Sequence, residues 1–364
     1  MTPVNIHLDQ RLLPVQRATQ LTRSLHHLRS KETIRWTWAT TMKTPLPYFA
    51  PGEAESGKPA DAFAFVPHDR VSNWQEIDVL ILIAHGSDVS SRIFEYRNRN
   101  PNLLVLIWLW DNHVAQVNNL RTVMAGDIYF PSHAYASGYL PNLLAPFGSH
   151  VPLCVAQWDP SEAALFLADS SGIPRSNQLL LNYVDYKFSW RTTLLEQIRN
   201  HLPEANNLLM PPEDRGRYFK KTKRERYFEW AEHKCTLILP VDQDLSTRVF
   251  DALLAGQVII VPRNIPDFDS VISPESQNLL GVVRIEGFEM HQIRAGIARA
   301  IQNFDLAGDA GVKSRGNFVL QGHMLRERMY SILSALLAAA QETISVRFTE
   351  NQTLHPALRF TANS

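Results

Sequence analysis

Several features that mark common protein classes are scarce or missing in this sequence. Only 2 of its 364 residues are cysteine, Cys154 and Cys235, and both lie in apolar runs. Two such thiols predict neither a disulfide framework nor a cysteine metal site, and they are typical of a reducing compartment. The sequence has no apolar stretch of transmembrane length and no signal pattern at its start. We therefore expect a cytoplasmic protein, and peripheral association with the inner face of a membrane is compatible with these absences.

The chain also has no excess of positive or negative charge, because Lys and Arg together number 36, as do Asp and Glu. A formal net charge of zero does not suggest a nucleic-acid partner. The phosphate-binding pattern G-x-x-x-x-G-K-[ST] and the dinucleotide fingerprint G-x-G-x-x-G are both absent. An ATPase of that type and a typical NAD enzyme are therefore disfavoured.

The length of 364 residues is enough for two domains, each with its own core. Apolar runs alternate with helical patterns along the chain, which is typical of an α/β protein with parallel sheets. The best boundary by composition is the segment 170–176, which contains glycine and proline. We therefore expect one domain over 1–172, a second over 173–345 and a tail over 346–364.

The first half of the chain contains a plain α/β pattern. Apolar runs at 78–84, 103–110 and 127–130 predict buried strands. Helical patterns at 90–100 and 113–124 lie between them. Together these segments predict a βαβαβ arrangement with three parallel strands.

Each of these three strands is followed by a histidine, namely His85, His113 and His133. If the strands are neighbours, the three histidines line the same edge of the sheet. We interpret them as candidates for a general base or for binding an anionic group. Asp111 could itself be the base or could orient His113. For each histidine alone, helix capping or a backbone hydrogen bond remains an alternative.

The segment 234–273 predicts one βαβ unit in the second half. Apolar runs at 235–239 and 258–261 predict buried parallel strands, each closed by a proline. The helix between them begins at Ser246 or Thr247, and Gly256 suits a left-handed C-terminal cap.

The start of that helix is a candidate anion site. In a parallel sheet it lies at the carboxyl ends of the strands, where free N–H groups and a partial positive charge meet a ligand. Ser246, Thr247 and Arg248 occupy this position, and Asp251 follows one turn later. Arg248 would hold a phosphate while Asp251 accepts hydrogen bonds from a sugar or ribose hydroxyl. A capped helix with an exposed arginine is the alternative.

Further elements follow from the same patterns. We expect strands at 33–39, 151–157, 179–183, 207–210 and 280–285, and helices at 15–30, 161–168, 188–202, 291–303 and 324–340.

A basic segment precedes the βαβ unit. Seven Lys and Arg residues lie between Arg215 and Arg226, with two aromatic residues among them. We interpret Arg215 and Lys221 as further contacts to a diphosphate. A site for single-stranded nucleic acid and a solvated helix face are the alternatives.

The run Ser-Thr-Arg-Val-Phe-Asp-Ala-Leu-Leu-Ala-Gly-Gln-Val-Ile-Ile-Val-Pro, at 246–262, resembles the donor-binding segment of GT-B-fold glycosyltransferases, especially the exostosin-like kind. The resemblance implies two Rossmann-like domains facing each other across a cleft, with the active site between them. It implies that Ser246 and Arg248 lie near the phosphates of a nucleotide-sugar. Asp251 replaces the glutamate of the family pattern.

Metal-ligand patterns are weak. The triplets Asp242-Gln243-Asp244 and Asp267-Phe268-Asp269 resemble the metal signature of the other main glycosyltransferase fold, but they lie in the wrong half of the chain. A zinc site built from the three histidines is a minor alternative. We therefore expect no metal and no cofactor, with the nucleotide-sugar as co-substrate.

These observations predict a metal-independent glycosyltransferase that moves a sugar from a nucleotide-sugar donor to a glycan or lipid-linked acceptor. Assembly of bacterial surface polysaccharide is one setting that suits this activity. The alternative is a non-catalytic sugar- or nucleotide-binding protein of the same fold, or a transferase-like partner of another enzyme.

Overall fold

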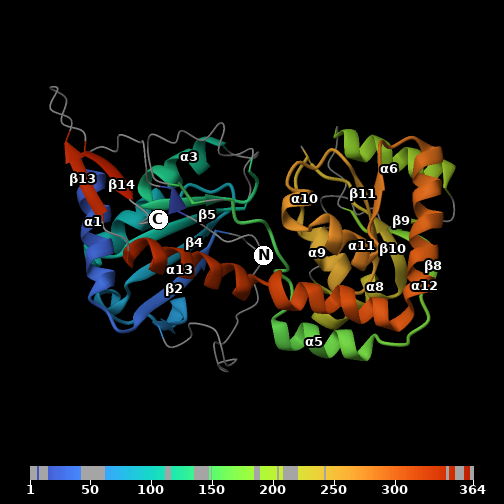
Figure 1. The fold of residues 1–364 in the computed structure, drawn as a ribbon, viewed down its shortest axis with the longest axis horizontal. Coiled ribbons are helices and arrows are strands. Elements are labelled where there is room, and N and C mark those ends of the chain that lie inside the picture. Colours follow the sequence, from blue (N-terminus) through green and yellow to red (C-terminus); the bar gives the residue numbers. More distant parts are fainter. Residues whose placement is uncertain are drawn as a thin grey trace. The chain divides into compact units, whose positions relative to one another are not determined.

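The computed structural model describes residues 6–7, 15–41, 62–110, 116–134, 147–148, 150–183, 189–202, 205–207, 220–241, 243–341, 344–348 and 356–360. The chain divides into two compact units. The N-terminal unit consists of residues 2–152 and 328–364, and the C-terminal unit contains residues 153–327. Each unit has a mainly parallel sheet with helices on both faces (Figure 1), which confirms the predicted pair of Rossmann-like α/β domains.

The boundary at 152/153 lies before the predicted one at 172/173. Helix α5, Pro160–Asp169, packs in the core of the C-terminal unit, where Ala163 and Phe166 are buried with Tyr227. Its sequence resembles that of any α/β crossover helix, so the pattern does not show which sheet it covers. The packing of α5 therefore moves the boundary upstream.

The sheet of the N-terminal unit has the strand order β1-β7-β6-β5-β4-β2-β3. All neighbouring strands are parallel except β1 and β7. The strands are β1 Ile6–His7, β2 Ile34–Thr40, β3 Phe63–Phe65, β4 Val79–Ala84, β5 Leu104–Leu109, β6 Ile128–Pro131 and β7 Phe147–Gly148. The predicted strands β4, β5 and β6 are direct neighbours, and every residue of the three is buried.

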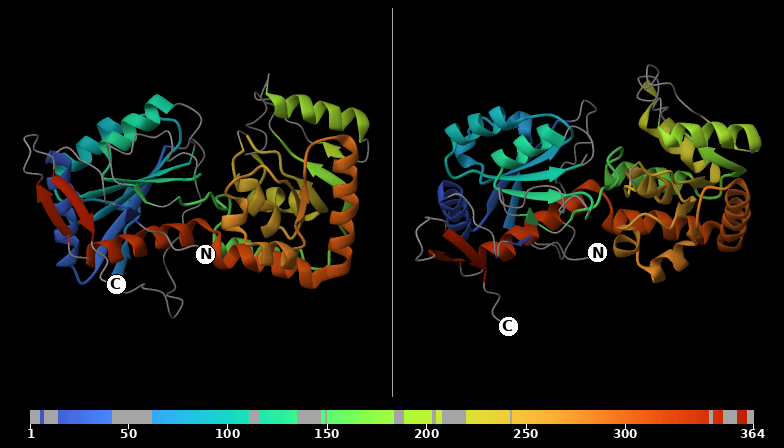
Figure 2. Two further views of the ribbon diagram at one scale, coloured as in Figure 1. Left: turned by 45° about the horizontal axis from the view of Figure 1, so that its top comes forward. Right: turned by 90° about the horizontal axis from the view of Figure 1, so that it is seen from above.

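Helices cover both faces of this sheet (Figures 1 and 2). They are α1 Val15–Arg29, α2 Ser90–Arg99, α3 Gln116–Ala125 and α13 Leu325–Gln341, with short 3₁₀ turns η2 His68–Arg70 and η3 Trp74–Glu76. Ile93 of α2 and Val123 of α3 join the core that contains Leu82 of β4. On the opposite face, the ring of Tyr330 lies 6.1 Å from that of Trp36.

The sheet of the C-terminal unit has the order β12-β11-β10-β8-β9 and is entirely parallel. Its strands are β8 Ser176–Leu181, β9 Asn206–Asn207, β10 His233–Leu237, β11 Val258–Pro262 and β12 Val283–Ile285. The helices besides α5 are α6 Trp190–His201, α8 Lys223–Ala231, α9 Thr247–Leu254, α10 Phe268–Val271, α11 Pro274–Leu280 and α12 Met290–Gly322.

Two separate core clusters fill the two faces of this sheet. Tyr227 of α8 and Phe250 of α9 belong to one cluster. Ile198 of α6 and Ile293 of α12 belong to the other. Helices α6 and α9 therefore lie on opposite faces, although they follow the adjacent strands β8 and β10.

Strand order shows where each sheet reverses its direction of winding. The chain runs from β8 outward to β9 and then crosses back to β10 on the other side of β8. In the N-terminal sheet it runs from β2 outward to β3 and then crosses to β4. In doubly wound sheets ligands bind outside the carboxyl ends of the strands at such a switch point. The switch points here lie between β8 and β10 and between β2 and β4.

Several element predictions need correction. The buried run 151–157 makes only an isolated parallel bridge, from Val155 to Met324, and is therefore not a strand. The run 280–285 is divided by Gly281, which adopts φ 72°, so only β12 is a strand. The helix expected to end at 303 continues as α12 to Gly322, with a break at Gly308.

The chain ends differ from the prediction as well. Strands β13 Ile344–Phe348 and β14 Pro356–Phe360 pair antiparallel where a tail was expected.

Strand β9 ends at Asn207, and positions 208–210 of the predicted strand lie outside the described residues. Within the described ranges, no helix is long and apolar enough to cross a membrane.

Two glycines in left-handed conformation allow a test of the C-terminal packing. Gly256 follows α9 with φ +80°, as predicted, and an added Cβ would lie 2.5 Å from Val312 Cγ1. Gly281 has φ +72°, but there the nearest atom is Asn303 Cβ at 3.4 Å. Gly281→Ala should lower the free energy of unfolding by about 1–2 kcal/mol through backbone strain. Gly256→Ala should lower the free energy of unfolding by the same strain and by about 1–3 kcal/mol in addition, because the new Cβ overpacks against Val312. Equal losses in chemical denaturation would contradict this packing.

Candidate functional site

Predicted site residues of the N-terminal unit follow neighbouring strands, as expected. His85 directly follows β4 and is exposed, and its backbone N–H donates to Thr41 Oγ1 at 2.7 Å. His133 lies two residues after β6 and is only 1% exposed. Asp111 and His113 lie outside the described residues. Of the two described histidines, only His85 is exposed, so a role for His133 in contacting substrate is not supported.

Metal-ligating side chains do not gather in the described ranges. No group of three or more His, Cys, Asp or Glu residues there could hold a metal ion. Asp242, Asp111 and His113 fall outside those ranges. The two cysteines are free and buried, and burial raises the pKa of the Cys235 thiol to about 12. At neutral pH Cys235 is therefore an inert thiol.

The start of α9 lies where the sequence places it, after β10 at the switch point of the C-terminal sheet. Ser246 is the N-cap residue, with extended φ −77° and ψ 158°, but its side chain makes no capping hydrogen bond. Ser246 Oγ is buried and has no hydrogen-bond partner in the described part of the chain. The backbone N–H groups of Thr247 and Arg248 likewise have no partner there. Donors are thus unused at the positive end of the helix dipole.

Arg248 is held firmly within the C-terminal unit. Its guanidinium carbon lies 3.9 Å from the ring centroid of Tyr183 and 4.7 Å from that of Trp230. Nη1 donates to the backbone oxygen of Asn182 at 3.1 Å, and Nη2 donates to Asn182 Oδ1. The arginine therefore ties α9 to the end of β8. Two guanidinium nitrogens are engaged in this way, while Nε has no partner in the described part of the chain. The predicted contact of Arg248 to a donor phosphate stays a prediction, and these contacts give the side chain a structural role as well.

Asn182 and Glu229 extend this contact into a polar network. Asn182 Nδ2 donates to Glu229 Oε1 at 2.7 Å, and the other oxygen of Glu229 pairs with Lys221. The Glu229 side chain is only 10% exposed. Lys221, predicted to contact a donor phosphate, thus forms an ion pair within the C-terminal unit, and its contact to a phosphate stays a prediction. Asn182 is not among the predicted site residues, although it directly follows the strand β8, just as the predicted histidines follow their strands.

Tyr183 joins the two strands at the switch point. Its hydroxyl donates to the backbone oxygen of Leu237 and accepts from the N–H of Leu239, each at 2.8 Å. Leu237 ends β10, whereas Tyr183 lies two residues after β8. The ring that Arg248 stacks on is therefore fixed at both strand ends.

Asp251 lies inside the unit, where it is only 2% exposed. Gln157 Nε2 donates to its Oδ2 at 2.9 Å, and Oδ1 has no partner in the described ranges. Burial raises the pKa of Asp251 to about 7, opposed by the Gln157 hydrogen bond and by the charges of Arg248 and Arg226. The predicted contact of Asp251 to a sugar hydroxyl therefore stays a prediction, and it requires a ligand to reach a carboxyl that is buried in the described conformation.

The basic segment is largely paired. Lys223 donates to Glu162 at 2.6 Å, and Arg224 pairs with Asp169 and lies 4.5 Å from the ring centroid of Phe228. Arg226 donates to a backbone oxygen at 2.9 Å. Arg215 lies outside the described residues. These contacts attach α8 to α5, so the described cations of the segment are largely structural.

Comparison with known proteins gives only distant likenesses. Neither a family model nor a curated protein matches the chain. A trehalose 6-phosphate synthase structure from Burkholderia multivorans has a TM-score of 0.46 and 10% identity, over 72% of each chain. The sucrose-phosphate synthase of Thermosynechococcus elongatus has a TM-score of 0.44 and 9% identity, over 91% of this chain and 94% of that one. A pneumococcal O-GlcNAc transferase in complex with UDP and GlcNAc has a TM-score of 0.40 and 11% identity, over 71% and 56%. Likenesses this distant assign neither a family nor an activity.

The contacts of Arg248 predict a structural role. Arg248→Ala removes two cation–π contacts and leaves Asn182 Oδ1 without its donor, so the free energy of unfolding should fall by about 2–3 kcal/mol. Arg263, which is 61% exposed and pairs with an exposed glutamate, offers a control. Arg263→Ala should change it by less than about 1 kcal/mol. Urea denaturation measures both, and an equal effect of the two substitutions would contradict the structural role.

The raised pKa of Asp251 predicts a pH dependence of stability. The folded value is about 7 and the ordinary value 3.8, so the unfolded chain ionises first as pH rises. Because of this difference, the free energy of unfolding falls progressively as the pH rises from about 4 to about 7, by at most about 4 kcal/mol. Asp251→Asn removes the penalty. Its thermal midpoint should therefore exceed that of the wild type at pH 8, and the difference should shrink toward pH 4.

The exposed Asp309 provides a matched control for this measurement. Asp309→Asn removes an exposed carboxyl and should not reproduce the gain in thermal midpoint at pH 8. If Asp251→Asn gave no gain at pH 8 either, Asp251 would not be the group that titrates near neutral pH.

Proposed function

We propose that this chain is a glycosyltransferase that takes a sugar from a nucleotide-sugar donor. The carrying observation is the start of α9 at the switch point between β8 and β10. There the N–H groups of Thr247 and Arg248 and the hydroxyl of Ser246 have no partner in the described ranges. Unused donors at a helix N-terminus favour an anion, and a diphosphate supplies several acceptor oxygens for them.

The fixed guanidinium of Arg248 adds a positive charge to this site. Its stacking on Tyr183 and Trp230 and its bonds to Asn182 hold the charge in one place. A preorganised charge stabilises the diphosphate leaving group without reorganising as the sugar bond breaks. The proposed role of Arg248 is therefore electrostatic, while the amides and the Ser246 hydroxyl make the direct contacts.

The proposed reaction uses no metal, because helix amides and Arg248 meet the phosphate charge. The acceptor hydroxyl needs a base. We assign that role to one of the polar residues that follow the strands of the N-terminal sheet, and His85 is the candidate that the structure describes. Asp111 and His113 belong to the same proposal. The acceptor is proposed to be a glycan or a lipid-linked glycan.

Nucleotide binding tests the donor site. Of UDP, GDP, CMP and dTDP, at least one should raise the thermal midpoint of the purified protein, because a ligand of the native state stabilises it. Ser246→Ala should weaken that nucleotide about tenfold, since one hydrogen bond to a charged group is lost. Its ligand-free stability should hardly change, because the hydroxyl bonds nothing in the described ranges.

Ser273 is the matched control, because its side chain does cap its helix by accepting from the N–H of Ser276. Ser273→Ala should lower stability by about 1 kcal/mol and leave nucleotide affinity unchanged. Loss of affinity in Ser273→Ala but not in Ser246→Ala would place the nucleotide elsewhere. Slow hydrolysis of the matching nucleotide-sugar that survives EDTA would support a metal-independent transferase. Binding without hydrolysis would favour the non-catalytic alternative.

A further inference from the structure

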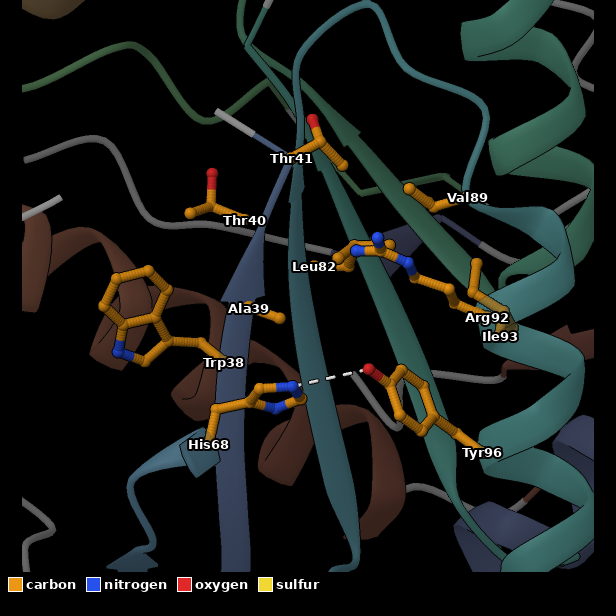
Figure 3. A pocket seen from close by; sticks show the side chains of 10 residues that line it. All are labelled: Trp38, Ala39, Thr40, Thr41, His68, Leu82, Val89, Arg92, Ile93 and Tyr96. Atoms are coloured by element: carbon orange, nitrogen blue, oxygen red, sulfur yellow. Dashed lines mark hydrogen bonds between the residues drawn. The ribbon is translucent and has the colours of Figure 1, made fainter. Parts of the chain in front are cut away.

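The N-terminal unit contains a cavity of 260 Å³ at its own switch point. Ala39 and Leu82, from the neighbouring strands β2 and β4, line it together with Val89 and Ile93 beside α2 (Figure 3). Binding pockets for small molecules are mostly apolar and measure about 300 Å³ or more. A cavity just below that size suits a ligand with a single ring.

One cation points into this cavity. The side chain of Arg92 extends from α2 across the space toward Leu82 (Figure 3). No Asp or Glu is among the lining residues, and Arg92 makes no ion pair or side-chain hydrogen bond within the described ranges. A guanidinium that has no acidic partner in the described ranges and extends over apolar walls can pair with the carboxylate of a ligand that also contacts those walls.

Polar groups stand at fixed positions around the same space. The Tyr96 hydroxyl and His68 Nε2 share a hydrogen bond of 3.3 Å, and the Tyr96 ring stacks on Trp74 with centroids 4.2 Å apart. Burial lowers the pKa of His68, and the nearby charge of Arg92 acts in the same direction, against that of Asp69. At neutral pH His68 is therefore uncharged, which leaves Arg92 as the only charged group among the lining residues.

The hydroxyl of Thr41 lies beside this space at the carboxyl end of β2, whereas the Thr40 side chain lies on the other side of the strand, with Trp38 (Figure 3). Thr41 Oγ1 also accepts the backbone N–H of His85. The cavity thus borders the strand ends that carry the predicted catalytic histidine, and both belong to the same unit.

We propose that this cavity binds a small organic carboxylate with a single ring. One guanidinium matches one carboxylate as a bidentate pair, and the apolar walls accept the ring. A phosphate carries more charge than one arginine balances and has no apolar part to fill the walls. The inference goes beyond the proposed transferase, because it concerns a ligand held by the N-terminal unit and depends on no nucleotide.

Calorimetric or saturation-transfer titration of the full chain with benzoate and cyclohexanecarboxylate tests the proposal. At least one should bind at concentrations up to about 10 mM, whereas benzamide and inorganic phosphate should not. Arg92→Gln should weaken the binding at least tenfold, and Arg92→Lys should recover part of it because a point charge replaces the fork. Tyr96→Phe should weaken it less.

Arg99→Gln is the matched control, because Arg99 is an exposed arginine on the same helix that does not line the cavity. It should leave carboxylate affinity unchanged. The proposal is wrong if neither carboxylate binds, if phosphate or benzamide binds equally well, or if Arg92→Gln and Arg99→Gln act alike. Arg92 is itself exposed, so the far-ultraviolet circular dichroism of Arg92→Gln should match that of the wild type.

Discussion

The reversal of winding between β8 and β10 is the constraint on which the candidate donor site depends. Because the chain moves outward from β8 and returns on its other side, α6 and α9 leave adjacent strands on opposite faces. Because these two helices diverge, neither covers the carboxyl ends of β8 and β10. Residues of the connecting segments lie at this edge instead, among them Asn182, Tyr183 and Ser246. The same reversal between β2 and β4 coincides with the cavity that Arg92 enters. One topological rule therefore accounts for both candidate sites.

Charged groups at the donor site are fixed by contacts within the C-terminal unit. Arg248 is stacked and hydrogen bonded, and Glu229 accepts from Asn182 and pairs with Lys221. These side chains are already restrained before any ligand binds, so they lose less conformational entropy when an anion binds. Asp251 differs, because burial keeps its carboxyl near its midpoint of ionisation at neutral pH. Its charge, and with it the field around Arg248, therefore varies with pH.

Local patterns in the sequence predicted the strands well and the side-chain partners poorly. Apolar runs closed by polar residues located β4, β5, β6, β10 and β11, because buried parallel strands have a local signature. The pairing of Asn182 with Arg248 and of Gln157 with Asp251 joins residues 66 and 94 positions apart, which no local pattern contains. The run 151–157 has the composition of a strand but lacks the neighbouring strand that would make it one. The Arg92 cavity escaped prediction for the same reason, because its walls come from separate elements.

The crystal structure of the chain with a bound nucleoside diphosphate is the most direct test of the donor site. Phosphate oxygens should lie within hydrogen-bond distance of the Thr247 and Arg248 amides and of Ser246 Oγ. The guanidinium of Arg248 should stay in contact with the rings of Tyr183 and Trp230. A nucleotide bound away from the start of α9 would contradict the proposed donor site, and so would an Arg248 side chain that leaves both rings to bind the phosphate.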